Sequence, residues 1–590
     1  MPSIAQQQTK LQQAVALHRN GALEQAQAIY HEILAMQPRH FDALHLLGVI
    51  AAQTRDPQRA VELIGKALEI NPNSAAALCN RAAALHELGH LEQALANYDR
   101  AIALKPDYTE AHFKRGKLLH QTGQLDAALA AYERAVALKA DYGAAHFHRG
   151  LVLHALGQLD AALGAYDRAA ALATDDAEVH SWRGDVLWQL DRLDAALQSY
   201  DRAIEIDPAY AQAHSNRGIV LRKLEMLDAA LESFDRAIAL KPDYAEAHFN
   251  RGVVLRELRR LDEALESFGR AIALRADYAE AYCHRSYVRL LKGDFANGWL
   301  DHEWRWLDKY GSNIHERRNF PQPLWLGKEN IAGKTILLHS EQGLGDTLQF
   351  CRYAKLVAAL GARVILEVPR PLLNLLVDLE GVSQLVVKGT ALPPFDYQCP
   401  LMSLPLAFNT DLDTIPAELP YLRADRSKVA QWQARLGERI KPRIGLVWSG
   451  NPRNRNDRNR SIPLAELMPH LPAAHQYVSL QKDVREPDRQ TLQANVQLLD
   501  FAAELHDLGD TAALCECMDL VISVDTLLAH LSGALGKRTW VLLPFDADWR
   551  WLTAPTDCPW YPTARLYRQA RIGEWRGALE RLEADLTRLR

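Results

Sequence analysis

The chain has 590 residues, of which 48% are hydrophobic and 24% are charged, and its formal net charge is -5. This composition is typical of a well-packed globular protein, and it excludes a disordered chain, a collagen and a small disulfide scaffold. The slight acidity argues against a dedicated nucleic-acid-binding protein, which normally carries a basic surplus. We therefore expect no nucleic-acid partner.

The cysteines and the N-terminal residues indicate a cytoplasmic protein. The nearest cysteines, Cys515 and Cys517, lack the two-residue spacing of a zinc or thioredoxin motif. The first residues are polar and show no basic-then-apolar signal pattern. No uncharged apolar run reaches the roughly 18 residues that a membrane span needs. We expect a cytoplasmic location and no membrane span.

A 34-residue period runs through the first half of the chain. Each unit has an aromatic residue, an alanine four residues earlier and a small residue further upstream, and it predicts two short amphipathic helices in close contact. The aromatic residues are Tyr98, Tyr132, Tyr166, Tyr200, Phe234 and Phe268, and the small residues are Gly116, Gly150, Gly184, Gly218 and Gly252. We expect eight units between about residues 5 and 280, followed by a degenerate ninth that caps the stack.

The ninth unit contains Trp299, Trp304 and Trp306, which we expect to join the stack to the second half. In period, small residue, alanine and closing proline, the units resemble the tetratricopeptide repeat. The resemblance implies a superhelix whose concave surface binds a partner, usually a peptide.

Three columns of residues recur along the repeats. We interpret the arginines chiefly as pairing between repeats with acids such as Asp107, Asp141, Asp243 and Asp277, and the histidines as packing residues. In O-GlcNAc transferase, whose repeats are similar, an asparagine ladder holds the acceptor backbone, which implies acceptor contacts for Asn80, Asn216 and Asn250. The arginines are Arg81, Arg115, Arg149, Arg183, Arg217, Arg251 and Arg285, the histidines His112, His146, His180, His214 and His248, and the third column Asn80, Lys114, His148, Trp182, Asn216, Asn250 and His284.

From about Gly333, short apolar strands alternate with helices. This alternation predicts parallel sheets covered on both faces, and two such series divided near residues 425–442 predict two Rossmann-like lobes with a cleft between them. We expect strands at 335–339, 362–368, 384–387, 443–448, 477–480, 496–499, 520–524 and 539–543, and a helix over 347–360. The predicted domains are a repeat superhelix over 1–310 and lobes over 311–440 and 441–590.

Ligands of such lobes bind outside the carboxyl ends of the strands, and three segments fall there. Gly343, Gly345 and Asp346 open the first helix, where glycines let backbone approach an anion; Asp346 could instead be a simple helix cap. Asp525 and Thr526 would flank the exposed amides of a later helix, and His530 lies one turn on, unless it merely packs against the sheet.

The remaining segment follows the strand at 443–448. Trp448, Ser449 and Asn451 precede four arginines, Arg453, Arg455, Arg458 and Arg460. Guanidinium groups bind phosphate bidentately, so this segment suits a phosphate-bearing ligand. The alternative is a solvated basic loop.

One segment resembles the nucleotide-sugar site of the lipopolysaccharide heptosyltransferases, whose pattern is D-[ST]-G-x-x-H followed by A-L-G-K-P. This segment is VISVDTLLAHLSGALGKRTWVLLP. Two further segments are similar to segments of that family, namely GLGDTLQFCRYAKLV and GLVWSGNPRNRNDRNRSIP. With its repeats, the whole chain resembles the bacterial tetratricopeptide-repeat glycosyltransferases, some of which glycosylate flagellin. The resemblance implies an α-helical superhelix followed by an α/β domain of GT-B type, whose second lobe holds the nucleotide sugar.

The resemblance also implies residue roles. Asp346 matches the general base on the acceptor hydroxyl, Arg460 matches a basic residue that neutralises the leaving phosphate, and Asp525, Thr526 and His530 match residues that hold the donor. The implied donor site further includes Gly343, Gly345, Ser449, Asn451 and Arg458. Leu527 departs from the family's glycine, and its side chain would crowd the approach to a diphosphate, which leaves the donor open.

Glycosyl transfer needs a base for the incoming hydroxyl and positive charge for the departing phosphate. We expect no Asp-x-Asp motif near these segments, so arginines and a helix dipole would replace a metal, and we expect no cofactor beyond the nucleotide-sugar co-substrate. The leading hypothesis is an inverting glycosyltransferase that modifies Ser or Thr of a polypeptide, flagellin being one candidate. The alternatives are a noncatalytic scaffold with a degenerate transferase domain, and a glycan- or lipid-directed transferase.

Overall fold

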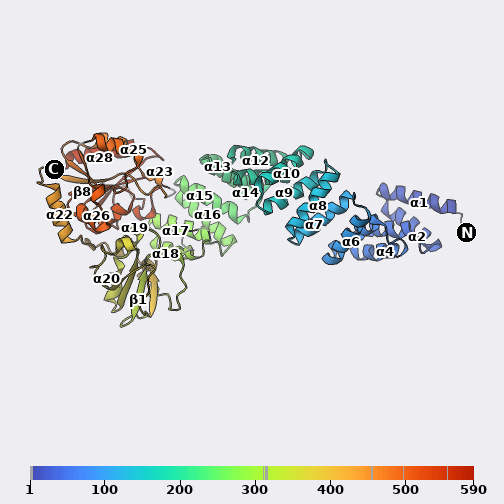
Figure 1. The fold of residues 1–590 in the computed structure, drawn as a ribbon, viewed down its shortest axis with the longest axis horizontal. Coiled ribbons are helices and arrows are strands. Elements are labelled where there is room, and N and C mark those ends of the chain that lie inside the picture. Colours follow the sequence, from blue (N-terminus) through green and yellow to red (C-terminus); the bar gives the residue numbers. More distant parts are fainter. Residues whose placement is uncertain are drawn as a thin grey trace. The chain divides into compact units, whose positions relative to one another are not determined.

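The computed structural model describes residues 4–309, 311, 316–453, 456–495, 497–553 and 556–589. The chain divides into two compact units, Met1–Pro242 and Asp243–Arg590. The first unit consists of helices, and the second contains further helices followed by two α/β lobes (Figure 1). Arg455 of the predicted phosphate-binding segment and Val496 of a predicted strand lie outside the described residues.

The helices of the first unit pack as consecutive pairs. They are α1 (Ile4–Arg19), α2 (Leu23–Met36), α3 (Phe41–Gln53), α4 (Pro57–Ile70), α5 (Ala75–Glu87), α6 (Leu91–Leu104), α7 (Thr109–Gln121), α8 (Leu125–Leu138), α9 (Gly143–Ala155), α10 (Leu159–Leu172), α11 (Ala177–Gln189), α12 (Leu193–Ile206), α13 (Ala211–Lys223) and α14 (Leu227–Leu240). The second unit begins with α15 (Ala245–Glu257), α16 (Leu261–Leu274), α17 (Ala279–Lys292) and α18 (Phe295–His302). The eight predicted repeats and the short ninth pair, α17 and α18, are therefore confirmed.

Close packing of each small residue against the aromatic residue of its own pair explains the period. A Cβ atom added to Gly184 would lie 2.7 Å from Cε1 of Tyr200. The ring cannot move away easily, because the Tyr200 hydroxyl donates to Asp185 Oδ1 at 2.6 Å and the residue is only 2% exposed. Only glycine therefore lets α11 and α12 approach to this distance.

The arginine column pairs between repeats, but with other acids than those predicted. Arg183 Nε donates to Asp167 Oδ1 of the preceding repeat at 2.6 Å, and its Nη1 donates to Ser199 Oγ of its own repeat at 2.6 Å. The predicted partners Asp107, Asp141, Asp243 and Asp277 occupy exposed turns between units. The acid that follows the aromatic residue of the preceding repeat faces the arginine instead, because it lies on the helix packed beside it; these acids are Asp99, Glu133, Asp167 and Asp201.

The histidine column has the structural role that we expected. Nε2 of His112, His146 and His214 lies 3.0–3.2 Å from a carbonyl oxygen of the preceding turn, at Pro106, Ala140 and Pro208. Each ring thus ties the start of its helix to the turn before it.

Two parallel sheets form the lobes. The first lobe has the strand order β3-β2-β1-β4, and the second lobe has the order β10-β9-β8-β5-β6-β7. The strands are β1 (Thr335–His339), β2 (Arg363–Val368), β3 (Val382–Val387), β4 (Tyr397–Pro400), β5 (Arg443–Val447), β6 (Gln476–Ser479), β7 (Leu498–Asp500), β8 (Leu520–Val524), β9 (Thr539–Leu543) and β10 (Ala564–Arg568). The bounds predicted for β1, β8 and β9 match the structure to the residue. The bounds predicted for the other expected strands differ by one or two residues, and β4 and β10 were not predicted.

The helices of the lobes lie between the strands in the chain, except α28, which follows the last strand. They are α19 (Leu344–Phe350), α20 (Tyr353–Ala359), α21 (Leu404–Ala407), α22 (Arg426–Leu436), α23 (Asp457–Arg460), α24 (Leu464–Leu467), α25 (Glu486–Ala494), α26 (Leu508–Glu516), α27 (Leu527–Ala534) and α28 (Arg576–Arg588). The six-stranded sheet is buried on both faces: Leu446 and Leu582 belong to one hydrophobic cluster, and Val521 and Ala529 belong to another.

The single helix predicted over 347–360 is wrong, because the chain breaks there into α19 and α20. The hydroxyl of Tyr421 donates to the Leu348 carbonyl at 2.9 Å, and Nε of Arg352 donates to the Gln349 carbonyl at 2.8 Å. Side chains thus take carbonyls that a continuous helix would give to its own N–H groups.

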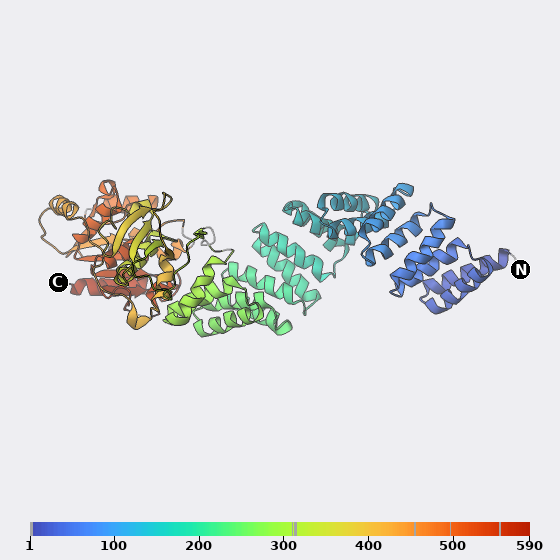
Figure 2. The same ribbon diagram turned by 90° about the horizontal axis from the view of Figure 1, so that it is seen from below.

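The joint between the last repeats and the lobes rests on Trp299, which is 1% exposed. Its ring centroid lies 5.3 Å from that of Trp549, and its Nε1 donates to the Thr410 carbonyl at 3.1 Å. Trp304 instead stacks on Tyr282 of α17 at 4.0 Å. Figure 2 shows α15–α18 in green beside the lobes. Among the described residues, no helix is both long and apolar enough to cross a membrane.

We predict that Gly184→Ala destabilises the repeats by about 1–3 kcal/mol, because the new methyl group overlaps the fixed ring of Tyr200. The matched control is Gly164→Ala in α10, where an added Cβ meets nothing within 4 Å and should stabilise by up to about 1 kcal/mol. Thermal unfolding of both variants, followed by circular dichroism, checks this; equal midpoints would contradict it.

Candidate functional site

The topology of each sheet brings predicted segments together. In the second lobe the strand order reverses between β5 and β8, and the segments after these strands begin at Trp448 and Asp525. In the first lobe it reverses between β1 and β4, and the segment after β1 leads to Gly343 and Asp346. Ligands of doubly wound sheets bind at such switch points.

The two switch points face each other. α19 of the first lobe contacts α27 of the second, and a Cβ atom added to Gly345 would lie 3.0 Å from Cδ2 of His530. Gly345 therefore sets how closely the two helices approach. Gln342, just before this turn, has a φ of 58°, a left-handed conformation that is costly for a residue with a side chain and is enriched at functional sites.

Asp346 lies in the first turn of α19 with both carboxylate oxygens engaged. Oδ2 accepts from the Gly343 backbone N–H at 2.7 Å, and Oδ1 accepts from Arg550 of the second lobe. Burial raises the pKa of Asp346, whereas Arg550 and the Gly343 N–H oppose this rise. Asp346 therefore does cap α19, and it also faces the other lobe.

Arg550 is the main residue that the sequence analysis missed. It lies on a 3-10 turn, η8 (Trp549–Trp551), and is 7% exposed. Its Nε donates to Gln349 Oε1 at 2.6 Å and its Nη1 donates to Asp548 Oδ1 at 2.8 Å. One feature of the sequence could have indicated Arg550: it is a charged residue between two tryptophans, shortly after a buried strand.

The expectation that no Asp-x-Asp motif lies near the site was wrong, because Asp546-Ala547-Asp548 adjoins Arg550. Both carboxylates are paired with arginines: Asp546 Oδ1 lies 3.5 Å from Nη1 of Arg259, and Asp548 binds Arg550. Among the residues that the structure describes, no group of three or more His, Cys, Asp or Glu could hold a metal ion.

Asp525 directly follows β8, beside this cluster. Its Oδ1 accepts from Trp551 Nε1 at 2.9 Å, and its carbonyl accepts from Arg460 Nη1 at 2.9 Å. Burial, with added repulsion from Asp548, raises the pKa of Asp525 to about 6. Asp525 and Arg460, from segments 65 residues apart, are therefore in direct contact.

His530 is 6% exposed and lies in an aromatic cluster. Its ring stacks on Trp551 at 5.5 Å, and its Nδ1 lies 3.0 Å from the Tyr561 hydroxyl. Burial, together with the charges of Arg550 and Arg352, lowers the pKa of His530 to about 3. The imidazole is therefore neutral at physiological pH. The ring contacts match the alternative that His530 has a packing role.

Arg460 is the predicted arginine that turns towards the site. Its guanidinium lies against Gly450, where an added Cβ would meet Nη2 at 2.6 Å. Ser449 is buried, whereas Asn451 and Arg458 are exposed, as is Arg453. Arg460 therefore contacts the Asp525 segment directly, through the Asp525 carbonyl.

Arg485 is a second cation that sequence reasoning missed here. Its Nη2 donates to the Gly450 carbonyl at 2.9 Å and to Ser461 Oγ at 3.1 Å, and it also pairs with Asp457. It follows β6, the neighbour of β5, so its strand end lies beside the same switch point.

Thr526 occupies the N-cap position of α27 without a capping hydrogen bond from its side chain, and Leu527 is the first residue of that helix. The Thr526 hydroxyl lies 3.2 Å from Ser523 Oγ. The Leu527 side chain packs against the hydrophobic cluster shared by the lobes. Leu527 is thus half-buried at the position where the resembling family has glycine.

A buried ion pair supports the turn that carries Asp346. Arg305, from the segment after α18, donates through Nε and Nη2 to both oxygens of Glu341 at 2.9 and 2.8 Å. Arg305 is 3% exposed and Glu341 is 2% exposed. Removing one member of such a pair typically costs 3–5 kcal/mol, so this pair holds the last repeat against the β1 loop.

The predicted acceptor-binding asparagines are partly engaged within the repeats. Asn80 Nδ2 lies 3.0 Å from His45 Nε2, and Asn216 Nδ2 donates to Asp185 Oδ1 at 2.7 Å. Asn250 lies on α15 and is half-buried. Their contact with an acceptor stays a prediction.

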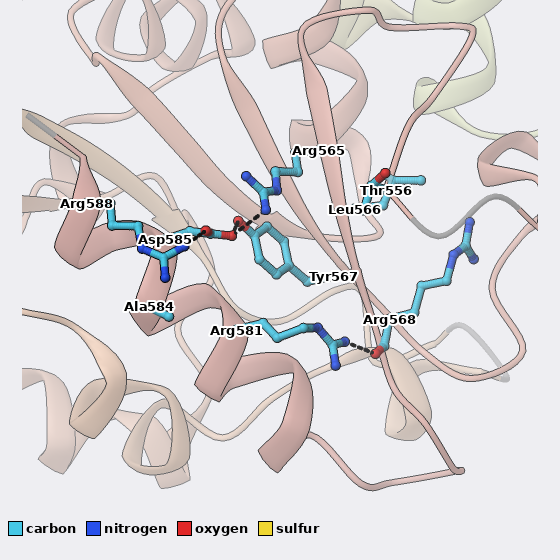
Figure 3. A pocket seen from close by; sticks show the side chains of 9 residues that line it. All are labelled: Thr556, Arg565, Leu566, Tyr567, Arg568, Arg581, Ala584, Asp585 and Arg588. Atoms are coloured by element: carbon cyan, nitrogen blue, oxygen red, sulfur yellow. Dashed lines mark hydrogen bonds and ion pairs between the residues drawn. The ribbon is translucent and has the colours of Figure 1, made fainter.

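A pocket of about 510 Å³ lies between β10 and α28 (Figure 3). Arg565, Arg581 and Arg588 line it, yet Arg565 pairs with Asp585 at 2.6 Å and Arg581 donates to the Arg568 carbonyl at 2.8 Å. β9 separates β10 from β8, so this pocket is not at the switch point.

Comparison with known proteins concerns mainly the repeats. Models described as TPR repeat match residues 84–123, 116–157, 150–191 and 184–225, and models described as tetratricopeptide repeat match 11–75, 63–96 and 215–296. Protein FlbA of Caulobacter vibrioides is 26% identical over 329 residues, which are 51% of this chain and 54% of that protein. The chain thus spans about half the length of this curated relative.

Some solved structures that are similar to the chain are described as tetratricopeptide proteins. YrrB, described as a TPR protein with an unusual peptide-binding site, is 32% identical, with 32% of this chain and 96% of that chain covered and a TM-score of 0.30. MamA is 23% identical, with 29% and 94% covered and a TM-score of 0.27. The matched residues between 11 and 296 carry tetratricopeptide repeats, a class of module that binds proteins.

We predict that the free energy of unfolding of the wild type, relative to Asp525→Asn, falls as the pH rises from about 4 to about 6. The folded chain holds a proton on Asp525 that the unfolded chain, with a pKa of 3.8, releases earlier. The pKa difference limits this fall to about 3 kcal/mol. Urea unfolding followed by tryptophan fluorescence between pH 4 and 8 checks this, and parallel pH curves would disprove it.

Proposed function

We propose that the chain is a glycosyltransferase that moves a sugar from a nucleotide-activated donor to Ser or Thr of a polypeptide bound by the repeats. The observation that carries the proposal is the approach of two switch points, with Asp346 on one lobe and Asp525 and Arg460 on the other. The switch points of such doubly wound sheets are where nucleotide-linked substrates bind.

The described charges fit the two requirements of the reaction. A carboxylate at Asp346 can accept the proton of an acceptor hydroxyl, as a general base does. Arg460, together with the N-terminus of α27, can stabilise negative charge on a departing phosphate. The donor-binding roles of Gly343, Gly345, Ser449, Asn451, Arg458, Thr526 and His530 are part of this proposal.

The proposed transfer is inverting and uses no metal. The carboxylates that could attract a cation, Asp546 and Asp548, are already paired with Arg259 and Arg550. The charge of each of these carboxylates is thus already balanced by a guanidinium group.

The proposed acceptor is a polypeptide, and flagellin is one candidate. The tetratricopeptide repeats support this, because such arrays bind peptides on an extended surface. We propose the cytoplasm as the compartment, since all seven cysteines are free and cytosolic thiols stay reduced.

We expect Asp346→Asn to lower sugar transfer by about 10²–10⁴-fold, the usual contribution of a general base, with donor binding little changed. Transfer is measured by mass spectrometry after incubation with nucleotide sugars and extracts of cells that lack the protein. The matched control is Asp510→Asn, which removes a comparable capping carboxylate at the start of α26. Full activity of a folded Asp346→Asn variant would sink the proposal.

The role of the repeats is tested by a chain that begins at Asp243, the start of the second compact unit. We expect it to bind the nucleotide sugar as the full chain does but to lose modification of polypeptides, because most of the peptide-binding surface is gone. Calorimetry measures donor binding, and mass spectrometry measures the modification. Retained polypeptide modification would contradict the recruiting role.

Leu527 favours a second candidate, a noncatalytic scaffold. A leucine in the first turn of α27 removes the closest backbone approach that a glycine would allow. Calorimetry with a panel of nucleotides and nucleotide sugars separates the two, because a scaffold binds none of them.

A further inference from the structure

Arg550 links the two lobes through three side chains. Asp346 and Gln349, which bind its Nη2 and Nε, belong to α19 of the first lobe, whereas Asp548, which binds its Nη1, belongs to the second. The Arg550 side chain is only 8% exposed. A guanidinium group keeps its proton in proteins, so a permanent positive charge lies against Asp346.

We propose that Arg550 is a positioning residue for the transfer reaction, which holds Asp346 as an oriented, ionised carboxylate on α19. The role of Asp346 as the base rests on the proposed function. The ion pair itself rests on the geometry of α19 and η8.

The orientation follows from the two contacts of the carboxylate. Oδ2 is held by the Gly343 N–H and Oδ1 by Arg550. Each carboxylate oxygen has two lone pairs, and the Asp346 backbone N–H is a further donor to the group, so the carboxylate still has accepting capacity for an acceptor hydroxyl. Because the group is held at both oxygens, the remaining lone pairs point in fixed directions.

Ionisation depends on the same contact. Burial alone favours the protonated acid, which cannot accept a proton. Arg550 and the Gly343 N–H favour the carboxylate, while Asp548 raises the pKa of Asp346. Arg550 and Asp548 therefore act on Asp346 in opposite directions.

Other titratable groups around the pair supply little positive charge. His530 of α27 has a pKa of about 3 because it is buried, and burial also lowers the pKa of His302 on α18. Asp525 lies beyond Trp551, and Arg460 contacts the Asp525 backbone. Arg550 is the cation in direct contact with Asp346.

The last repeats hold the segment that carries Arg550. The Tyr287 hydroxyl of α17 donates to the Ala547 carbonyl at 2.9 Å, and Arg259 lies 3.5 Å from Asp546. Trp549 packs against Trp299 of α18. These contacts fix the segment, so Arg550 reaches Asp346 from a rigid support.

The test compares pH profiles of kcat/KM for Arg550→Gln, Arg550→Lys and Asp548→Asn in the full chain. The substrate is the nucleotide sugar that binds in the calorimetric panel, and the reaction is its hydrolysis or transfer. In Arg550→Gln we expect the acid limb to move up by about one pH unit and kcat at pH 7 to fall about 10–100-fold, with partial recovery at higher pH. Lysine should restore part of the loss.

Asp548→Asn should move the acid limb the opposite way, to lower pH, because it removes a negative neighbour of Asp346. Arg435→Gln is the control: it breaks an exposed pair between Arg435 of α22 and Glu504 and should leave the profile unchanged. Three outcomes would overturn the proposal. One is a loss of activity in Arg550→Gln that is equal at every pH, and another is a shift of the acid limb in the same direction in Arg550→Gln and Asp548→Asn. The third is a change in donor KM alone.

A second measurement does not need turnover. Urea midpoints for Asp346→Asn, Arg550→Gln and the double variant form a cycle that should show coupling between the two residues; additive effects would also overturn the proposal. If no nucleotide sugar binds the wild type, the proposed function fails, and the cycle still decides whether Arg550 holds Asp346.

Discussion

The charge of Arg550, enclosed between two lobes, constrains the surrounding structure. A buried cation is tolerated only when its donors meet acceptors in good geometry. Asp346, Gln349 and Asp548 provide these acceptors, and two of the three come from α19. The guanidinium thus ties α19 to the second lobe. The guanidinium group of Arg352 finds its acceptors in backbone carbonyl groups, since its Nη1 donates to the Trp560 and Pro416 carbonyls.

The last repeats belong structurally with the lobes. The compact second unit begins at Asp243, well before the end of the repeat pattern. Arg305 reaches from the segment after α18 into the first lobe and binds Glu341, which lies in the loop before Asp346. Tyr287 supports the segment that carries Arg550. If the proposed function holds, recognition and chemistry share a rigid boundary, and repeats at that boundary contribute to the shape of the site.

Sequence reasoning succeeded where one local pattern decided the structure. The repeats follow from the spacing of Gly184 and Tyr200 and their equivalents, because the fit between a missing Cβ and a ring recurs in each unit. Central strands such as β1 and β8 are buried on both faces and read as continuous apolar runs. The missed strands, β4 and β10, are edge strands, whose polar residues, such as Gln398 and Arg565, hide the pattern.

The sequence by itself determined the repeat period, the two strand-helix series and the three segments at strand ends, because backbone periodicity is a local property. Only the tertiary structure decided which arginine meets which acid. Arg550 pairs with Asp346 across 204 residues, and Arg460 meets the Asp525 carbonyl across 65. These pairs depend on how two separately formed sheets pack, and the free energy of burying a charge depends on all its neighbours at once. No spacing along the chain records that information.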